Sequence, residues 1–151
     1  MSQANVEIVR RYFDAIIRMI DTHAENPCSF VGALEAEDRD AEARRVLDQL
    51  HPEVRWRNLL GVVFEGKLDC ARAVDELMGA SRYYSVTLDD LVVLGDDRIL
   101  AIQEVGMRGQ NGAVAAALSV FSVMTLREGL IMQVEEFLNR VEALEAVGLG
   151  G

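Results

Sequence analysis

The sequence predicts an α+β fold in which a curved, antiparallel or mixed sheet wraps around N-terminal helices. Three observations support this prediction. Apolar residues recur every three to four positions in the first fifty residues, as in amphipathic helices. From residue 83 to 140 four long strand candidates follow one another, and the Gly-containing separators at 95–97, 109–112 and 127–129 are hairpin signals. Helices followed by an antiparallel meander form layers of the α+β kind.

The N-terminal part is predicted to contain two helices. Residues 3–20 place one apolar stripe on a helix face, and this stripe consists of Val6, Val9, Phe13, Ile16 and Ile20. Tyr12 lies at the border of that face. Breakers at Asn26, Pro27 and Gly32 predict a turn over 21–32. Residues 33–50 are rich in helix formers and predict a second helix that ends before His51-Pro52.

From Val54 the hydrophobic period changes to two, which predicts strands. Val54, Trp56 and Asn58 share one face of the first strand, and residues 60–65 are its expected hairpin partner around Gly61. A helix is expected over 69–80. The later strands are expected at 83–94, 98–108, 113–126 and 130–140.

Composition limits the classes of function. A length of 151 residues and a mass of 16.7 kDa indicate a single domain over residues 1–151. The net charge of −10 argues against nucleic acid and anionic membranes as partners. The charged start and the short apolar runs favour a cytoplasmic protein. Cys28, Cys70, His23 and His51 show no metal spacing, so we expect no metal site and no cofactor.

Strand parity predicts where acid–base chemistry is located. Glu136 shares a strand face with Met132, Val134 and Leu138, and burial of that face would raise the pKa of the carboxyl group towards a useful range. Glu104 shares a face with Leu100, Ile102 and Gly106 in the same way. Asn58 adds an amide on the inward face of the first strand. The predicted catalytic residues are therefore Glu136, Asn58 and Glu104.

Simpler interpretations stand beside these. Each acid could lie at a sheet edge or pair with a neighbouring arginine, here Arg140 or Arg108. Asn58 could satisfy backbone groups where its strand ends. Aromatic and apolar residues of the same faces are expected to form the wall of an apolar pocket: Trp56, Tyr12, Phe13, Val134, Met132 and Met107.

Several segments, in their order and spacing, resemble bacterial SnoaL-like proteins of the nuclear transport factor 2-like superfamily. They are VEIVRRYF from Val6, HPEVRW from His51, FEG from Phe64, LGDDR from Leu94, and Glu128 through Leu149. The resemblance covers about 125 residues. It implies a cone-shaped sheet around the helices, a fold that hosts cyclases, isomerases, hydrolases and non-catalytic binders. Residues 21–45 exceed the usual helix connection and are predicted to be an inserted helical segment.

Two enzymes of this fold allow comparison by position. The resemblance to limonene epoxide hydrolase implies that Trp56 occupies the position of that enzyme's catalytic tyrosine, Asn58 that of its asparagine and Glu136 that of the aspartate on its last strand. The arginine of that enzyme has no counterpart in this sequence. The resemblance to ketosteroid isomerase implies that Tyr12 lies at the position of that enzyme's oxyanion-hole tyrosine and Asn58 at the position of its base, an aspartate. The polyketide cyclases of the family need one acidic group in an apolar pocket, which Glu136 with Asn58 would supply.

Three functions follow from this reasoning. The first is an isomerase, cyclase or hydrolase that uses acid–base chemistry on a small hydrophobic molecule. The second is a non-catalytic binder of such a molecule, and the third is an interaction module that uses the segment 21–45. Residues 113–123 are apolar or small on both strand faces, so a second subunit is expected to cover the outer face in a homodimer.

Overall fold

The computed structural model describes residues 2–23, 27–36, 40–80, 84–108 and 114–149 of the chain. The helices and strands follow in this order: α1 (Ser2–His23), α2 (Phe30–Glu35), α3 (Ala41–Leu47), β1 (Leu50–Arg57), β2 (Val63–Glu65), α4 (Lys67–Ala80), β3 (Tyr84–Val93), β4 (Arg98–Arg108), β5 (Val114–Arg127), β6 (Leu130–Phe137) and α5 (Arg140–Ala146). The predicted α+β class is confirmed.

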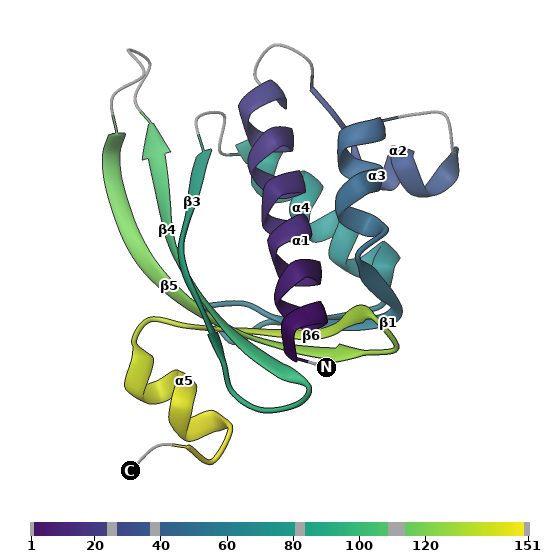
Figure 1. Ribbon diagram of the computed structural model, residues 1–151. Coiled ribbons are helices and arrows are strands. Elements are labelled where there is room, and N and C mark those ends of the chain that lie inside the picture. Colours follow the sequence, from purple (N-terminus) through teal and green to yellow (C-terminus); the bar gives the residue numbers. More distant parts are fainter. Residues whose placement is uncertain (1, 24–26, 37–39, 81–83, 109–113, 150–151) are drawn as a thin grey trace.

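The six strands form one mixed sheet in the order β2-β1-β6-β5-β4-β3. Only β1 and β6 pair in parallel within this sheet, and the other neighbours are antiparallel. The sheet bends strongly along β5, and α1 and α4 lie on its concave side with α2 and α3 further out (Figure 1). The curved sheet and these helices together enclose the main core.

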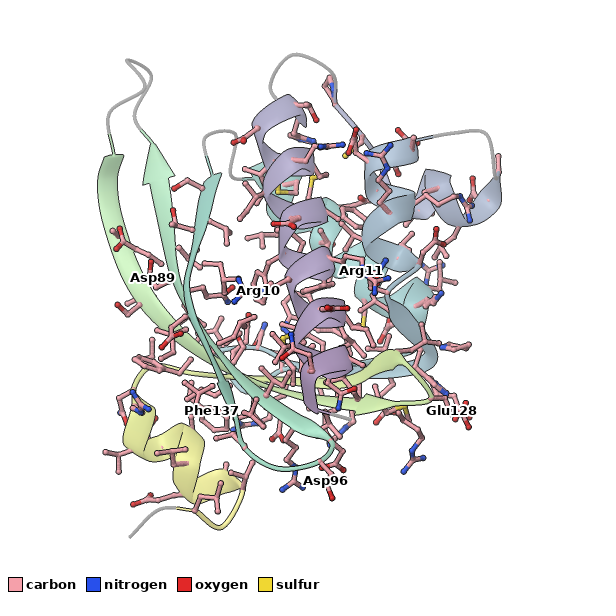
Figure 2. The ribbon with its side chains drawn as sticks, viewed as in Figure 1. Arg10, Arg11, Asp89, Asp96, Glu128 and Phe137 are labelled. Atoms are coloured by element: carbon pink, nitrogen blue, oxygen red, sulfur yellow. The ribbon has the colours of Figure 1, made fainter. Side chains whose placement is uncertain are left out.

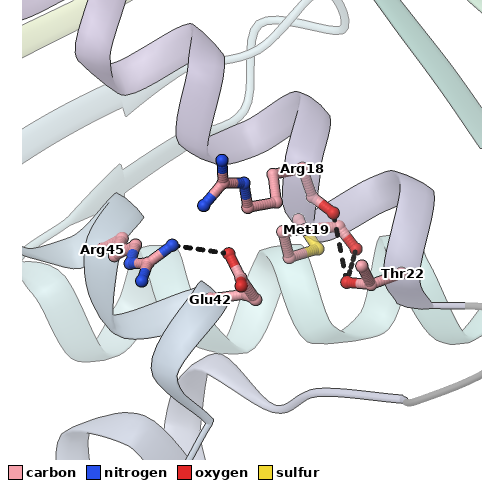
Figure 3. Close-up of polar contacts among 5 residues, drawn as sticks. All are labelled: Arg18, Met19, Thr22, Glu42 and Arg45. Carbon is pink, nitrogen blue, oxygen red and sulfur yellow. Dashed lines mark hydrogen bonds and ion pairs between the residues drawn. The ribbon is translucent and has the colours of Figure 1, made fainter.

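Helix α1 supplies the central part of that core. Val9 and Phe13 of the predicted stripe are buried, with exposed fractions of 0% and 3%. Met19, one turn before the helix end, is buried beside them at 2%. The helix extends three residues beyond its predicted end, and Thr22 turns its hydroxyl back to the carbonyl oxygens of Arg18 and Met19 (Figure 3).

The predicted single helix over 33–50 is instead two short helices. Helix α2 ends at Glu35 and α3 begins at Ala41. Asp40, which precedes α3, has a φ of 52° in the left-handed region, so one continuous helix cannot pass through it. Strand β1 then starts at Leu50, four residues before the predicted strand, because Leu50 pairs with Ile131 of β6.

The described part of the segment 21–45 packs into the core. Phe30 and Ala33 of α2 and Ala43 of α3 are almost fully buried. The carboxylate of Asp75 in α4 accepts hydrogen bonds from the Ser29 hydroxyl, the Phe30 N–H and the Val31 N–H, at 3.0, 2.7 and 3.1 Å. These bonds cap the start of α2 and fix it to α4. Nearby, Arg45 and Glu42 of α3 form an ion pair at 3.5 Å (Figure 3).

The C-terminal helix α5 covers part of the outer sheet face. Ala143 of α5 is fully buried together with Leu100 of β4 and Val123 of β5, in a second small core. Phe137, at the end of β6, packs on the same cluster (Figure 2). The predicted strand over 130–140 therefore ends at Phe137, and Asn139 caps α5 by accepting the N–H of Glu142 at 2.8 Å.

Two hairpin turns of the sheet contain acidic residues. Glu128 lies at the β5–β6 turn and Asp96 at the β3–β4 turn (Figure 2), and the Asp96 carbonyl accepts a hydrogen bond from the side-chain amide of Asn5 in α1 at 2.8 Å. Among the described residues, no helix combines the length and the apolar composition that crossing a membrane requires.

Candidate functional site

A cavity of about 120 Å³ lies between the helices and the concave face of the sheet. Helices α1 to α4 and strands β1, β3, β4, β5 and β6 all contribute to its wall. The wall is largely apolar, with Phe30, Met124 and Val54 among its buried members. Leu77 of α4, at 37% exposure, is the most exposed of the described lining side chains.

Glu136 is the carboxylate in this wall. It lies on β6, between the apolar cavity and a groove on the other side that is formed with Leu59 and α5. Burial raises the pKa of Glu136 above its ordinary value of 4.5, and hydrogen bonds from the indole N–H of Trp56 and the backbone N–H of Leu59 act more weakly in the opposite direction. The side chain therefore holds its proton more tightly than an exposed glutamate.

A row of polar side chains crosses the concave face over four neighbouring strands. Trp56 of β1 pairs with Val134 of β6, which places the indole next to Glu136, two residues further along β6. Glu136 is the direct cross-strand partner of Ser122 on β5. Ser122 accepts a hydrogen bond from the Gln103 amide of β4, at 3.2 Å from Nε2 to Oγ. The row thus runs Trp56, Glu136, Ser122, Gln103.

Five of the predicted site residues line the cavity. They are Glu136, Trp56, Tyr12, Phe13 and Val134. The Trp56 ring packs on Phe64 of β2 with ring centroids 5.2 Å apart, and Tyr12 meets Phe13 edge to face at 5.3 Å. These contacts fix the aromatic part of the wall. Met107 lies on β4, but its side chain is outside the part of the structure that is described.

Glu104 does not lie on the concave face, contrary to the parity prediction. It is exposed on the outer face of β4, and the neighbouring Gln103 is 7% exposed and lines the cavity. The predicted grouping with Leu100 and Ile102 is correct, but α5 buries Leu100 on the outer side. Because both faces of β4 are apolar at this point, alternation alone selected the wrong face.

Met132 is also absent from the cavity wall, and a β-bulge explains why. Val134 pairs with Met124 and Ile131 pairs with Leu126, so three steps along β6 match two steps along β5. The bulge takes up one residue between Ile131 and Val134. Ile131, fully buried in the main core, therefore occupies the inward place that simple alternation assigns to Met132.

Asn58 lies outside the cavity wall and serves the turn between β1 and β2. Its side-chain Oδ1 accepts hydrogen bonds from the N–H groups of Leu60 and Val62, both at 3.0 Å. This is the simpler interpretation of the residue, in which the amide satisfies backbone groups at the strand end. The predicted pair of Glu136 and Asn58 in one hollow is therefore wrong.

Gln103 and Ser122 were missed by the parity argument. Both are buried polar residues that contact the cavity, with exposed fractions of 7% and 1%. The signal that points to them is a polar side chain on the same strand face as buried apolar residues: Gln103 follows Ile99 and Ala101, and Ser122 precedes Met124. A polar group on a buried face is retained when it has a hydrogen-bond partner.

The cavity also contains one thiol. Cys70 lines it, and burial, with a smaller contribution from Asp69, raises the pKa of this thiol to about 11. A thiol with that pKa is uncharged at neutral pH and is a poor nucleophile. In the described ranges no group of three or more His, Cys, Asp or Glu side chains is placed to hold a metal ion. Glu136 is thus the main ionisable group of the wall.

Solved structures share this fold over almost the whole chain. A nuclear transport factor 2-like protein of unknown function from Burkholderia pseudomallei has a TM-score of 0.64 at 18% identity and covers 94% of this chain and 95% of its own. A proposed polyketide cyclase from Xanthomonas campestris pv. campestris has a TM-score of 0.62 at 18% identity, with coverages of 98% and 97%. A proposed ketosteroid isomerase from Kribbella flavida has a TM-score of 0.57 at 15% identity, with coverages of 92% and 80%.

At these identities the structural likeness establishes the fold alone. No curated protein matches the sequence. The SnoaL-like domain family matches residues 29–134, a range that begins inside the segment predicted to be an insertion and ends at Val134 of β6. Because that range spans most of the chain and includes most of the sheet around the cavity, the chain belongs to the SnoaL-like domain family.

Proposed function

We propose that this protein is an acid–base enzyme that moves a proton within a small hydrophobic carbonyl compound, as in isomerisation or cyclisation. The observation that carries the proposal is Glu136: a carboxylate at the wall of an apolar cavity, with its pKa raised by burial. A general base is most efficient when its pKa lies near the working pH, and burial moves a glutamate in that direction.

The polar row supplies the second group that this chemistry needs. Glu136 on β6 and Gln103 on β4 are separated by one strand, so the two strands that carry them lie roughly 10 Å apart. A small ring placed over Ser122 fits between the two side chains. The Gln103 amide carries a second N–H besides the one that it donates to Ser122, and we assign this N–H to the substrate carbonyl oxygen.

The proposed reaction balances within the substrate. The Glu136 carboxylate removes a proton from the carbon next to the carbonyl group. The electron pair of that C–H bond forms a C=C bond, and the π electron pair of the carbonyl group moves to its oxygen, which gives an enolate. The Gln103 N–H donates to this oxygen and stabilises the charge that develops there. Where the substrate also has a C=C bond next to the enolate, the charge extends along it as a dienolate, and Glu136 returns the proton to the far carbon, which completes an isomerisation. In a cyclase the enolate carbon attacks a second carbonyl group of the substrate, the π electron pair of that group moves to its oxygen, and this oxygen takes the proton from Glu136.

The cavity volume supports a proposal for the substrate class. An apolar protein cavity of roughly 150 Å³ holds a benzene molecule, and the cavity here is of similar size at about 120 Å³. The aromatic and aliphatic wall favours an uncharged ring over a charged one. A cyclic ketone with about one ring is therefore the substrate class that fits without movement of the wall.

Exchange of the α-hydrogens of cyclohexanone for deuterium, followed by NMR in D₂O, tests the proposal directly. The wild-type protein is expected to accelerate exchange, and Glu136→Gln is expected to reduce the rate about 10²–10⁴-fold because it removes the base but preserves the shape of the side chain. The matched control is Glu104→Gln, the same change on the exposed outer face, which should exchange at the wild-type rate.

The same samples test the alternative of a non-catalytic binder. If cyclohexanone perturbs the NMR signals of Trp56 and Gln103 but its α-hydrogens exchange no faster than in buffer, the cavity is a binding site only. Exchange that is equally fast with wild type and Glu136→Gln would remove Glu136 from the chemistry and overturn the proposal.

A further inference from the structure

The turn between β1 and β2 is held by the side chain of Asn58. In addition to the bonds from Leu60 N–H and Val62 N–H to Oδ1, the backbone N–H of Asn58 donates to the Val62 carbonyl and the N–H of Gly61 donates to the Asn58 carbonyl, both at 3.0 Å. Gly61 has a φ of +81°, which favours glycine. The side chain thus satisfies two donors that strand pairing leaves unused and defines the shape of the turn.

Leu59, inside this turn, lies against Glu136. Both residues contribute to the wall of a groove of about 530 Å³ between the end of β6 and α5. The backbone N–H of Leu59 donates to the Glu136 carboxylate. The carboxylate therefore faces the apolar cavity on one side and, on the other, an N–H whose position depends on the turn.

We propose that Asn58 is a positioning residue that acts on Glu136 through Leu59, by holding the turn in the shape that presents the Leu59 N–H to the carboxylate. The contact itself is independent of any reaction, and its consequence for catalysis rests on the proposed function. Two donors from β1 and its turn, the Trp56 indole N–H and the Leu59 N–H, then share the task of stabilising the charged base.

The other charged and titratable groups around Glu136 are the same in every variant compared below. Arg57, Glu142 and Glu145 line the groove with it, and Arg57 also lies over the Phe137 ring with its Cζ 6.0 Å from the ring centroid. On the cavity side, Tyr12 and Cys70 line the wall. A change in the Glu136 titration after a substitution in the turn therefore reports the Leu59 contact.

The experiment is a pH titration of the Glu136 side-chain carboxyl carbon by NMR, with Glu136→Gln used to assign the signal. Asn58→Ala is expected to move the midpoint to higher pH by roughly half a unit, the equivalent of one hydrogen bond. The matched control is Glu65→Ala, which breaks the Arg55–Glu65 ion pair at 3.5 Å on the same hairpin but leaves the turn intact. Its midpoint should equal the wild-type value.

A second variant and a direct reporter keep the test decisive if Asn58→Ala folds poorly. Gly61→Ala strains the same turn because of its positive φ, and its midpoint should move in the same direction. In the wild type, the amide signal of Leu59 should titrate with the same midpoint as Glu136. The proposal is overturned if the amide signal of Leu59 does not shift as Glu136 titrates. It is also overturned if the turn variants fold and keep the wild-type midpoint.

The outcomes for the two proposals are separable. A shifted midpoint in a protein that exchanges no ketone hydrogens supports the positioning role of Asn58 and contradicts the enzymatic function. Ketone exchange that depends on Glu136, together with an unshifted midpoint in Asn58→Ala, supports the function and contradicts the positioning role. When both hold, the midpoint of the pH–rate profile moves with the NMR midpoint.

Discussion

The carboxylate of Asp75 in α4 accepts the backbone N–H of Phe30 at 2.7 Å, and the Phe30 side chain forms part of the cavity wall. One acid thus couples a helix start to the shape of the site, across 45 residues of sequence. Because α2 has only six residues, its position depends on such contacts rather than on helix propensity.

Removal of this cap is expected to destabilise the protein. Asp75→Ala leaves the N–H groups of Phe30 and Val31 without their charged acceptor, so the free energy of unfolding in urea should fall by about 2–3 kcal/mol. Glu76→Ala, a change at the exposed neighbouring acid, is the control and should alter stability by less than about 0.5 kcal/mol. Equal stability of the two variants would contradict a structural role for Asp75.

Glu136 is expected to reduce the stability of the folded chain at neutral pH. The unfolded chain releases the Glu136 proton near the ordinary value of 4.5, whereas the folded chain holds it to higher pH because its pKa is raised. Between these two pKa values the folded state binds more protons, so stability falls as pH rises through that window. Glutamine carries no charge and avoids this loss.

The stability gained by Glu136→Gln over the wild type should therefore be larger at neutral pH than below pH 4.5. Urea unfolding at several pH values measures it. Glu104→Gln, on the exposed face of β4, should show no comparable pH dependence. A gain that is the same at acid and neutral pH would show that burial does not raise the pKa of Glu136.

Filling the cavity should prevent ligand binding without unfolding the chain. Ala71 of α4 is 1% exposed and lines the cavity, so Ala71→Leu places a larger apolar side chain in the space for the substrate. Binding of cyclohexanone, followed by NMR, should weaken by at least about tenfold, or ~1.4 kcal/mol. Ala73→Leu makes the same change on α4 outside the cavity wall and should bind like the wild type.

The predicted homodimer is a separate proposal about the outer sheet face. Helix α5 covers Leu100 and Val123, which is part of the cover that we expected from a second subunit. Ala117 and Ser119 of β5 remain exposed on that face. Sedimentation at micromolar concentration should give a dimer, and Ser119→Arg should dissociate it by placing a charge in the interface. A wild-type monomer would contradict this proposal.

Most of the architecture could be predicted because the helices and strands leave regular local patterns in the sequence. The stripe of α1, the helix over α4 and the four long strands were predicted within a few residues, because each element repeats one period over many positions. The break at Asp40 was missed because a left-handed residue leaves no periodic signal. Helix α5 begins at Arg140, soon after β6 ends at Phe137, so the predicted strand over 130–140 wrongly included the first residue of the helix.

The candidate site was harder to predict because it depends on which face of each strand is inward. Glu136 was placed correctly, and the bulge between Ile131 and Val134 is the reason that Met132 was not. Glu104 was misplaced because the cover from α5 makes both faces of β4 apolar. Strand alternation carries no information about a bulge or about a helix packed from the other side.

The bulge in β6 also determines where related sequences can differ in length. Ile131 and Glu136 both point inward although they are five positions apart, an odd offset, and the extra residue at 132–133 accounts for this. A homologue that lacks this residue would keep a regular ladder and still direct its acid inward. Alignment gaps of a single position therefore belong between Ile131 and Val134, where they leave the correspondence of the acidic position intact.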